Sequence, residues 1–191
     1  PSSLTSLELD LRRNRITAVG FADLMHSLPS RLTSLVLDLN WNLGLVWTLD
    51  VAQELRGLPP SLITLHLNLP SRRNETTDDV VHEITRALPA SLTSLQLDLQ
   101  GSSITDDCLA EFGHALPQGL VSLKLGCSAI SDAVCGRFAR GMPRGLAKLH
   151  IDRDANEVSD GISQVGMEAL REGVPHGCQV AVLAHHWYGP G

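Results

Sequence analysis

The fold is decided by the stretch Pro89-Ala90-Ser91-Leu92-Thr93-Ser94-Leu95-Gln96-Leu97, because close copies of it follow one another along the chain. Each copy begins with a proline, and successive prolines lie 26 to 32 residues apart. These prolines are Pro1, Pro29, Pro59, Pro89, Pro117, Pro143 and Pro175. Self-similarity at such a period is typical of a repeat protein, in which each unit buries its apolar face against its neighbours.

Six units carry a trio of aliphatic residues, of which the last two alternate with residues that are polar except for Val36. That alternation is the period of a strand with one buried face. The trios are Leu4, Leu7, Leu9; Leu32, Leu35, Leu37; Leu62, Leu65, Leu67; Leu92, Leu95, Leu97; Leu120, Leu123, Leu125; and Leu146, Leu149, Ile151. They predict six or seven parallel strands that stack in chain order, because only this arrangement buries all the trios together.

A helix is expected between each strand and the next proline. Thr77-Asp78-Asp79, Thr105-Asp106-Asp107 and Ser131-Asp132 each offer a hydroxyl to cap a helix and carboxylates to meet the positive end of its dipole. Apolar residues then follow at helical spacing, and the proline ends the helix because it cannot donate to the helical hydrogen bonds.

This order of strand, loop, helix and proline turn resembles the leucine-rich-repeat family, whose core signature is L-x-x-L-x-L-x-x-N-x-[LI]. The segment from Leu120 to Ile130 matches it with Ser128 in place of the asparagine. The shared pattern of 16–24 and 162–170 is most similar to the ribonuclease-inhibitor-type subclass. The resemblance implies an α/β solenoid, a curved horseshoe segment with a parallel sheet on its concave side and helices on its convex side. It says little about function, since one fold serves many roles.

The repeats predict a single domain over residues 1–191. Pro1 falls in the middle of a unit and is not preceded by an initiator methionine, so we expect the chain to be part of a longer one. In the last strand, two registers are open: the proline alignment turns Ala181 and Leu183 inward, whereas strand propensity favours the valines. The expected units are 1–28, 29–58, 59–88, 89–116, 117–142 and 143–174, followed by a C-terminal cap over 175–191 that includes His185-His186-Trp187-Tyr188.

Composition narrows the classes of partner and compartment. The formal net charge of −6 disfavours nucleic acid, which requires a clustered positive surface. No apolar run approaches the ~18 residues of a membrane span, and the start lacks the pattern of a signal peptide. The four cysteines show no C-x-x-C spacing and suit buried positions in a reducing compartment. We therefore expect a soluble, intracellular and cytoplasmic protein.

The sequence shows no catalytic motif and no paired Cys/His set at zinc spacing. His66 and His150 belong to units three and six, so about 14 Å separates them at ~4.8 Å per strand step. That distance is too long for one metal ion. We expect no enzymatic activity, no cofactor and no metal site.

The position after the second strand leucine is acidic in most units. It holds Asp10, Asp38, Asn68, Asp98, Gly126 and Asp152. Because this position alternates with inward leucines, it faces outward on the concave surface. The open interpretations are a solvated row of acids or carboxylates that bind loop amides, a contact for a basic partner, and a site for a bound cation. On the second interpretation, Asp10, Asp38, Asp98 and Asp152 are partner-binding residues.

The strand-to-helix loops are longer in units two, three and six, and insertions in repeat proteins often mark the binding face. Trp47 stands where other units place a capping hydroxyl and is expected to be exposed. Tryptophan and arginine dominate interface hot spots. Trp41, Trp47, Arg72 and Arg73 therefore form a second predicted contact patch. The alternative is that both indoles fold down to cover the widened loop.

Together these features favour a non-enzymatic module for protein interactions. We expect a scaffold or accessory subunit of a larger complex, which binds through the concave face and the adjacent loop edge to a partner that, on the acid-row hypothesis, has a basic surface. The alternative is the regulatory or substrate-recognition part of an enzyme system, of the GTPase-activating or ubiquitin-ligase-receptor type. No residue matches a catalytic position of such proteins.

Overall fold

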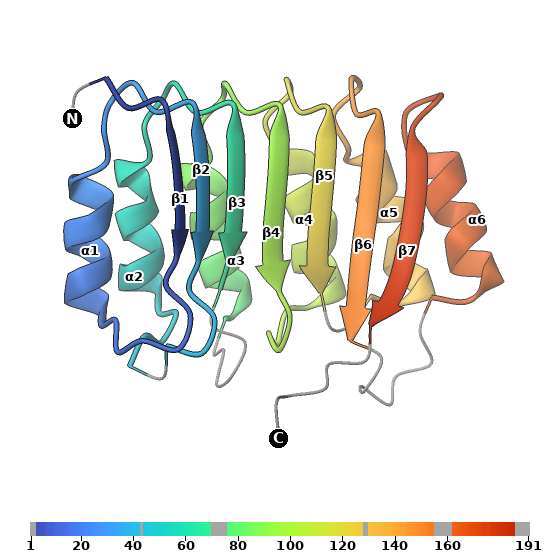
Figure 1. Ribbon diagram of the computed structural model, residues 1–191. Coiled ribbons are helices and arrows are strands. Elements are labelled where there is room, and N and C mark those ends of the chain that lie inside the picture. Colours follow the sequence, from blue (N-terminus) through green and yellow to red (C-terminus); the bar gives the residue numbers. More distant parts are fainter. Residues whose placement is uncertain (1–2, 43, 70–75, 128–129, 155–161, 186–191) are drawn as a thin grey trace.

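The strands form one parallel sheet that follows the order of the sequence, as the repeats predict (Figure 1). The computed structural model describes residues 3–42, 44–69, 76–127, 130–154 and 162–185. The strands of these residues are β1 (Ser6–Asp10), β2 (Ser34–Asp38), β3 (Thr64–Asn68), β4 (Ser94–Leu99), β5 (Ser122–Cys127), β6 (Lys148–Asp154) and β7 (Gln179–His185).

Equivalent leucines lie side by side in neighbouring strands. Leu65 pairs in register with Leu35 on one side and with Leu95 on the other, and all three are 1% exposed. The contact between these leucines confirms the predicted register. Burial of the leucine trios between sheet and helices is the main source of stability, at about 1.5 to 3 kcal/mol for each fully buried side chain.

Helices cover one face of the sheet, and the other face, here called the open face, is the one turned toward the viewer in Figure 1. The helices are α1 (Ala18–His26), α2 (Leu49–Gln53) with the short 3-10 helix η1 (Glu54–Gly57), α3 (Asp78–Ala87), α4 (Asp106–Ala115), α5 (Asp132–Arg140) and α6 (Gln164–Gly173). Thr77, Thr105 and Ser131 stand at the N-cap positions, and the predicted capping bond forms at Thr105, whose hydroxyl accepts from the Cys108 amide. At Thr77 and Ser131 the prediction is wrong, since neither side chain makes a cap bond. Leu88 and Leu116, each followed by a proline, are extended and end α3 and α4.

Acidic residues at the helix starts also join consecutive units. The Asp78 carboxylate accepts hydrogen bonds from the amide and the hydroxyl of Thr105 in the next unit, at 2.9 and 2.6 Å. Asp132 makes the same pair of bonds to Ser163. A carboxylate in the first turn of one helix thus holds the N-cap of its neighbour, which fixes the spacing between helices as well as between strands.

The last strand takes the register that strand propensity favours. Val180 pairs with Leu149 and Val182 with Ile151, and both valines pack against the core. Leu183 is 44% exposed, so the register from the proline alignment is wrong. The predicted cap 175–191 therefore contributes a seventh strand, and its last residues, 186–191, lie outside the described part of the chain.

Candidate functional site: the open face of the sheet

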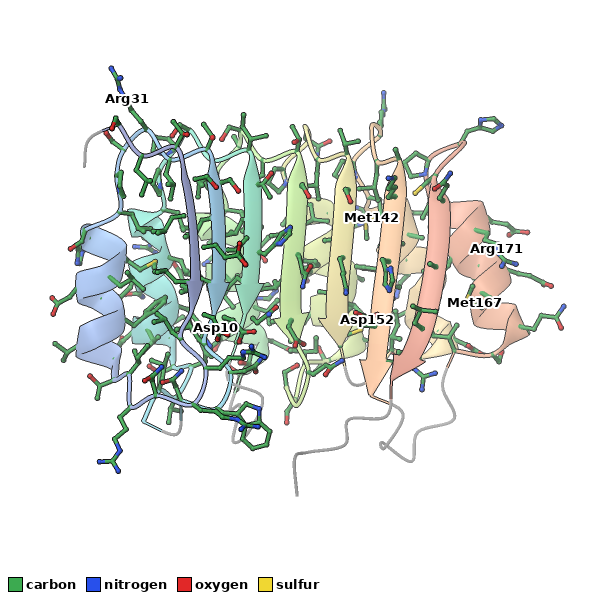
Figure 2. All side chains as sticks on the ribbon, viewed as in Figure 1. Asp10, Arg31, Met142, Asp152, Met167 and Arg171 are labelled. Carbon is green, nitrogen blue, oxygen red and sulfur yellow. The ribbon has the colours of Figure 1, made fainter. Side chains whose placement is uncertain are left out.

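Three rows of side chains cross the open face, because every second residue of each strand points away from the core. The hydroxyl row is Ser6, Ser34, Thr64, Ser94, Ser122, Lys148 and Gln179; the middle row is Glu8, Val36, His66, Gln96, Lys124, His150 and Ala181; the acid row is Asp10, Asp38, Asn68, Asp98, Gly126, Asp152 and Leu183. Figure 2 shows Asp10 and Asp152 at the same end of the sheet, toward the strand C-termini.

A groove of about 720 Å³ runs along the acid row. It brings together all four aspartates that the sequence analysis proposed as partner-binding residues. Its lining consists of Asp10, Arg12, Arg13, Asp38, Asn40, Trp41, Asn68, Gln96, Leu97, Asp98, Gln100, Lys124, Gly126 and Asp152. The groove therefore contains both signs of charge, and the position of each cation decides how much negative charge is left for a partner.

At the β1 end of the groove, the acids are paired with an arginine. The Arg12 guanidinium donates to both oxygens of Asp10, at 2.8 and 2.7 Å. These side-chain bonds lower the pKa of Asp10 to about 2. The same guanidinium lies 3.7 Å from the Asp38 carboxylate, which also accepts a bond from the Asn68 amide at 3.1 Å. One arginine thus serves two neighbouring units.

Three carboxylates of the acid row also bind the backbone where the chain leaves the strand. Oδ1 of Asp10, Asp38 and Asp98 accepts a hydrogen bond from the amide two residues later, at 3.2, 3.0 and 3.0 Å respectively. Such bonds satisfy amides that the sheet does not pair. The interpretation in which the carboxylates bind loop amides therefore describes these contacts, and the aspartates have a structural role whatever else they do.

Asp98 differs from the other aspartates of the row. No ion pair reaches its carboxylate from the described residues, and its pKa is raised by burial, with the charges of Asp152 and Asp38 adding to the effect. Gly126 lies beside it on β5, where any side chain would collide with Asp98 Oδ1. The absence of a Cβ at Gly126 makes room for this half-buried carboxylate.

We expect Asp98→Asn to raise the melting temperature at pH 7. When the pKa of a carboxyl group is raised in the folded state, the protein loses stability as the pH rises through that pKa. Ionised Asp98 therefore lowers the free energy of unfolding, and asparagine removes this loss. The difference between wild type and variant should vanish at acidic pH, where Asp98 is protonated. Thermal unfolding from pH 3 to pH 8 measures it.

Asp10→Asn is the matched control for this prediction. Because the pKa of Asp10 is lowered, its ionised form stabilises the fold above the unfolded pKa, and this stabilisation is lost as pH falls. The variant should melt at a lower temperature than wild type at pH 7. If both variants changed the melting temperature in the same direction at pH 7, the opposite pKa shifts of Asp98 and Asp10 would be contradicted.

At the β6 end, Asp152 is held by two cationic or titratable groups. Lys124 Nζ lies 2.9 Å from one carboxylate oxygen, and His150 Nε2 lies 2.7 Å from the other. Burial opposes ionisation of Asp152, but these hydrogen bonds keep its pKa below the usual value. The predicted site residues did not include Arg12, Lys124 and His150. Strand alternation places Lys124 and His150 on the open face, whereas Arg12 follows the end of β1 and is not placed by it.

Of the predicted loop patch, the structure describes Trp41 and Trp47, and it corrects the prediction for Trp47. Trp47 is 1% exposed, so its expected exposure is wrong: the indole packs edge to face against Phe21, with ring centroids 5.2 Å apart. Trp41 is half-buried, adopts a positive φ of 64° and lines the groove. Arg72 and Arg73 lie outside the described residues.

In the described ranges, no group of three or more His, Cys, Asp or Glu residues is placed to hold a metal ion. His66 and His150 stand on β3 and β6, three strands apart. Among the helices of these ranges, none is long and apolar enough to cross a membrane.

No protein-family model and no curated protein matches the sequence. Among solved structures, the chain is similar to the leucine-rich repeat-containing protein LegL7 from Legionella pneumophila, with 20% sequence identity and a TM-score of 0.56. The similarity covers 96% of this chain and 66% of LegL7. This chain has the leucine-rich-repeat fold. The ribonuclease-inhibitor-type subclass stays a prediction.

Proposed function

We propose that this leucine-rich-repeat protein is a non-enzymatic interaction module that binds another protein through the open face of its sheet, as a scaffold or accessory subunit of a larger assembly. The observation that supports the proposal is the mainly polar surface of the three rows, hollowed by the groove along the acid row. Strand-borne side chains held by hydrogen bonds lose little conformational freedom on binding, which favours recognition.

The charge of the groove bears on the kind of partner. Asp10 and Asp152 are already paired with cations of the chain, and Asp38 shares Arg12 with Asp10. Asp98 alone among the four has no ion pair from the described residues and offers a basic side chain a half-buried acceptor. A basic partner surface thus stays a prediction that depends chiefly on Asp98, and the acid row as a whole is not a strongly negative field.

A substitution in the centre of the open face tests the proposal. Gln96 lies on β4 in the middle row and borders the groove, so Gln96→Trp fills the surface without touching the core. Proteins captured by the wild type from a native extract should be lost with Gln96→Trp. The matched control is Arg171→Trp on α6, which Figure 2 shows pointing away from the sheet and which should retain them. If both variants capture the same proteins as wild type, the open face is not the binding face.

A further inference from the structure

A second hollow, of about 340 Å³, lies on the open face beside the groove and has a different charge. Its lining includes Lys124, Lys148, His66 and His150, and no aspartate or glutamate. The chain as a whole has 21 acidic residues against 15 lysines and arginines. The hollow thus carries both lysines without an acidic residue in its lining, and we call it the lysine hollow.

The two lysines of this hollow are the only lysines in the sequence. They stand on adjacent strands, where Lys124 is in register with His150 and Lys148 with Ser122. One strand step and two residues along the strand separate them, so their Cα atoms lie about 8 Å apart. Two ammonium groups on flexible stems at that distance can both reach one carboxylate placed between them.

The two lysines differ in how far the chain neutralises them. Lys124 is paired with Asp152 on the acid-row side, at 2.9 Å. Lys148 is exposed, and the described residues place no acidic group within ion-pair distance of it. Beside the hollow, Asp152 and Asp98 are acids whose charge interacts with Lys124, and the imidazoles of His66 and His150 lie in the lining. Lys148 is thus the lysine of this hollow that has no acidic partner among the described residues.

Hydrogen-bond donors surround this free charge. The hydroxyls of Ser94 and Ser122 and the amide of Gln179 line the hollow on neighbouring strands. A hydroxyl can donate to a carboxylate while the lysine supplies the charge, which is the usual composition of a charge-assisted contact. The pKa of His66 is lowered by burial and further by Lys124, so at neutral pH the hollow also has a neutral imidazole on its border.

We propose that the lysine hollow binds an acidic segment of a protein partner, with one Asp or Glu side chain seated between Lys148 and Lys124 beside the Ser122 hydroxyl. The lysine hollow and the groove share Gln96 and Lys124 in their linings, so the two adjoin on the open face. This inference rests on the proposed function and adds the sign of the partner's charge. That sign is opposite to the one expected from the acid row.

Reductive methylation with ¹³C gives a direct readout, because it keeps the positive charge and labels both lysines. The variants Lys124→Arg and Lys148→Arg each remove one methyl resonance and so assign the two signals. Titration with a hexaglutamate peptide at low ionic strength should shift both resonances saturably, and added salt should reverse the shift. Hexalysine should shift neither.

Variants then locate the contact. Lys148→Gln should weaken hexaglutamate binding by about two- to fivefold, as for a partly exposed ion pair, whereas Lys148→Arg should retain it. Arg171→Gln, which removes a charge from α6, is the matched control and should bind as wild type. Unchanged binding in Lys148→Gln, or no shift with hexaglutamate, would overturn the proposal.

Inorganic phosphate is the second probe. If phosphate shifts both resonances at concentrations where hexaglutamate shifts neither, the hollow takes a small anion and the proposal is wrong. The partner capture experiment separates the two inferences: loss of partners in Gln96→Trp together with their full retention in Lys148→Gln would leave the open face as the binding face and refute the acidic segment.

Discussion

Replacing Trp47 with alanine is expected to lower the free energy of unfolding by about 3 to 5 kcal/mol, the usual cost of removing a large buried aromatic side chain. The indole is 1% exposed and meets Phe21 at an interplanar angle of 74°. Truncation leaves a cavity between α1 and the second unit and removes an edge-to-face aromatic contact. Urea denaturation measures the loss as a shift of the midpoint without a change in slope.

Trp41→Ala is the matched control, since Trp41 precedes Trp47 by six residues, is only half-buried and borders the groove. Its truncation should cost less stability than that of Trp47. Affinity for a captured partner should respond in the reverse order. If Trp47→Ala unfolds like wild type but loses the partner, the indole is an exposed contact after all.

Leu95→Ala is expected to cost about 2 to 5 kcal/mol, because Leu95 lies in the middle of the sheet and is 1% exposed. Its register partners are Leu65 on β3 and Leu123 on β5, so the cavity opens between two units that depend on this contact. In a stack, each unit is stabilised by its neighbours, and a central lesion weakens two interfaces at once.

Leu183→Ala provides the comparison within the same sheet. Leu183 is 44% exposed and lies on the open face of β7, so its truncation should change stability by less than about 0.5 kcal/mol. Equal losses for Leu95→Ala and Leu183→Ala would mean that the leucine trios do not form the core. Chemical denaturation of both variants decides the question.

The repeat made the fold predictable to the level of single residue pairs. Proline spacing and leucine alternation together leave one register in which Leu35, Leu65 and Leu95 align, and the structure has that register. The last strand was ambiguous because its alternation is weak: Val180 and Val182 compete with Ala181 and Leu183 for the inward positions. The strand preference of the β-branched valines agrees with the register that the structure has.

The site was only partly predictable, for a different reason. Outward placement of the acid row follows from strand periodicity, but the charge that it presents depends on which cation lies near each carboxylate. Arg12 and Lys124 reach their acids through side-chain geometry that no repeat pattern encodes. The exposure of Trp47 was wrongly predicted for the same reason. The repeat locates its backbone, but the indole packs against the ring of Phe21, which the repeat does not show.

Core residues and surface residues alternate along each strand, so the surface can be mutated separately from the core. Leu65, Leu95 and Leu123 carry stability, and the residues between them, such as His66, Gln96 and Lys124, carry recognition. The two sets share a backbone but point to opposite sides of the sheet, so the outward residues can be substituted without changing the contacts of the core. A library that randomises the hydroxyl and middle rows of β3 to β6 would therefore yield folded variants with new binding specificities, while the acid row, whose carboxylates close the strand ends, would tolerate far less.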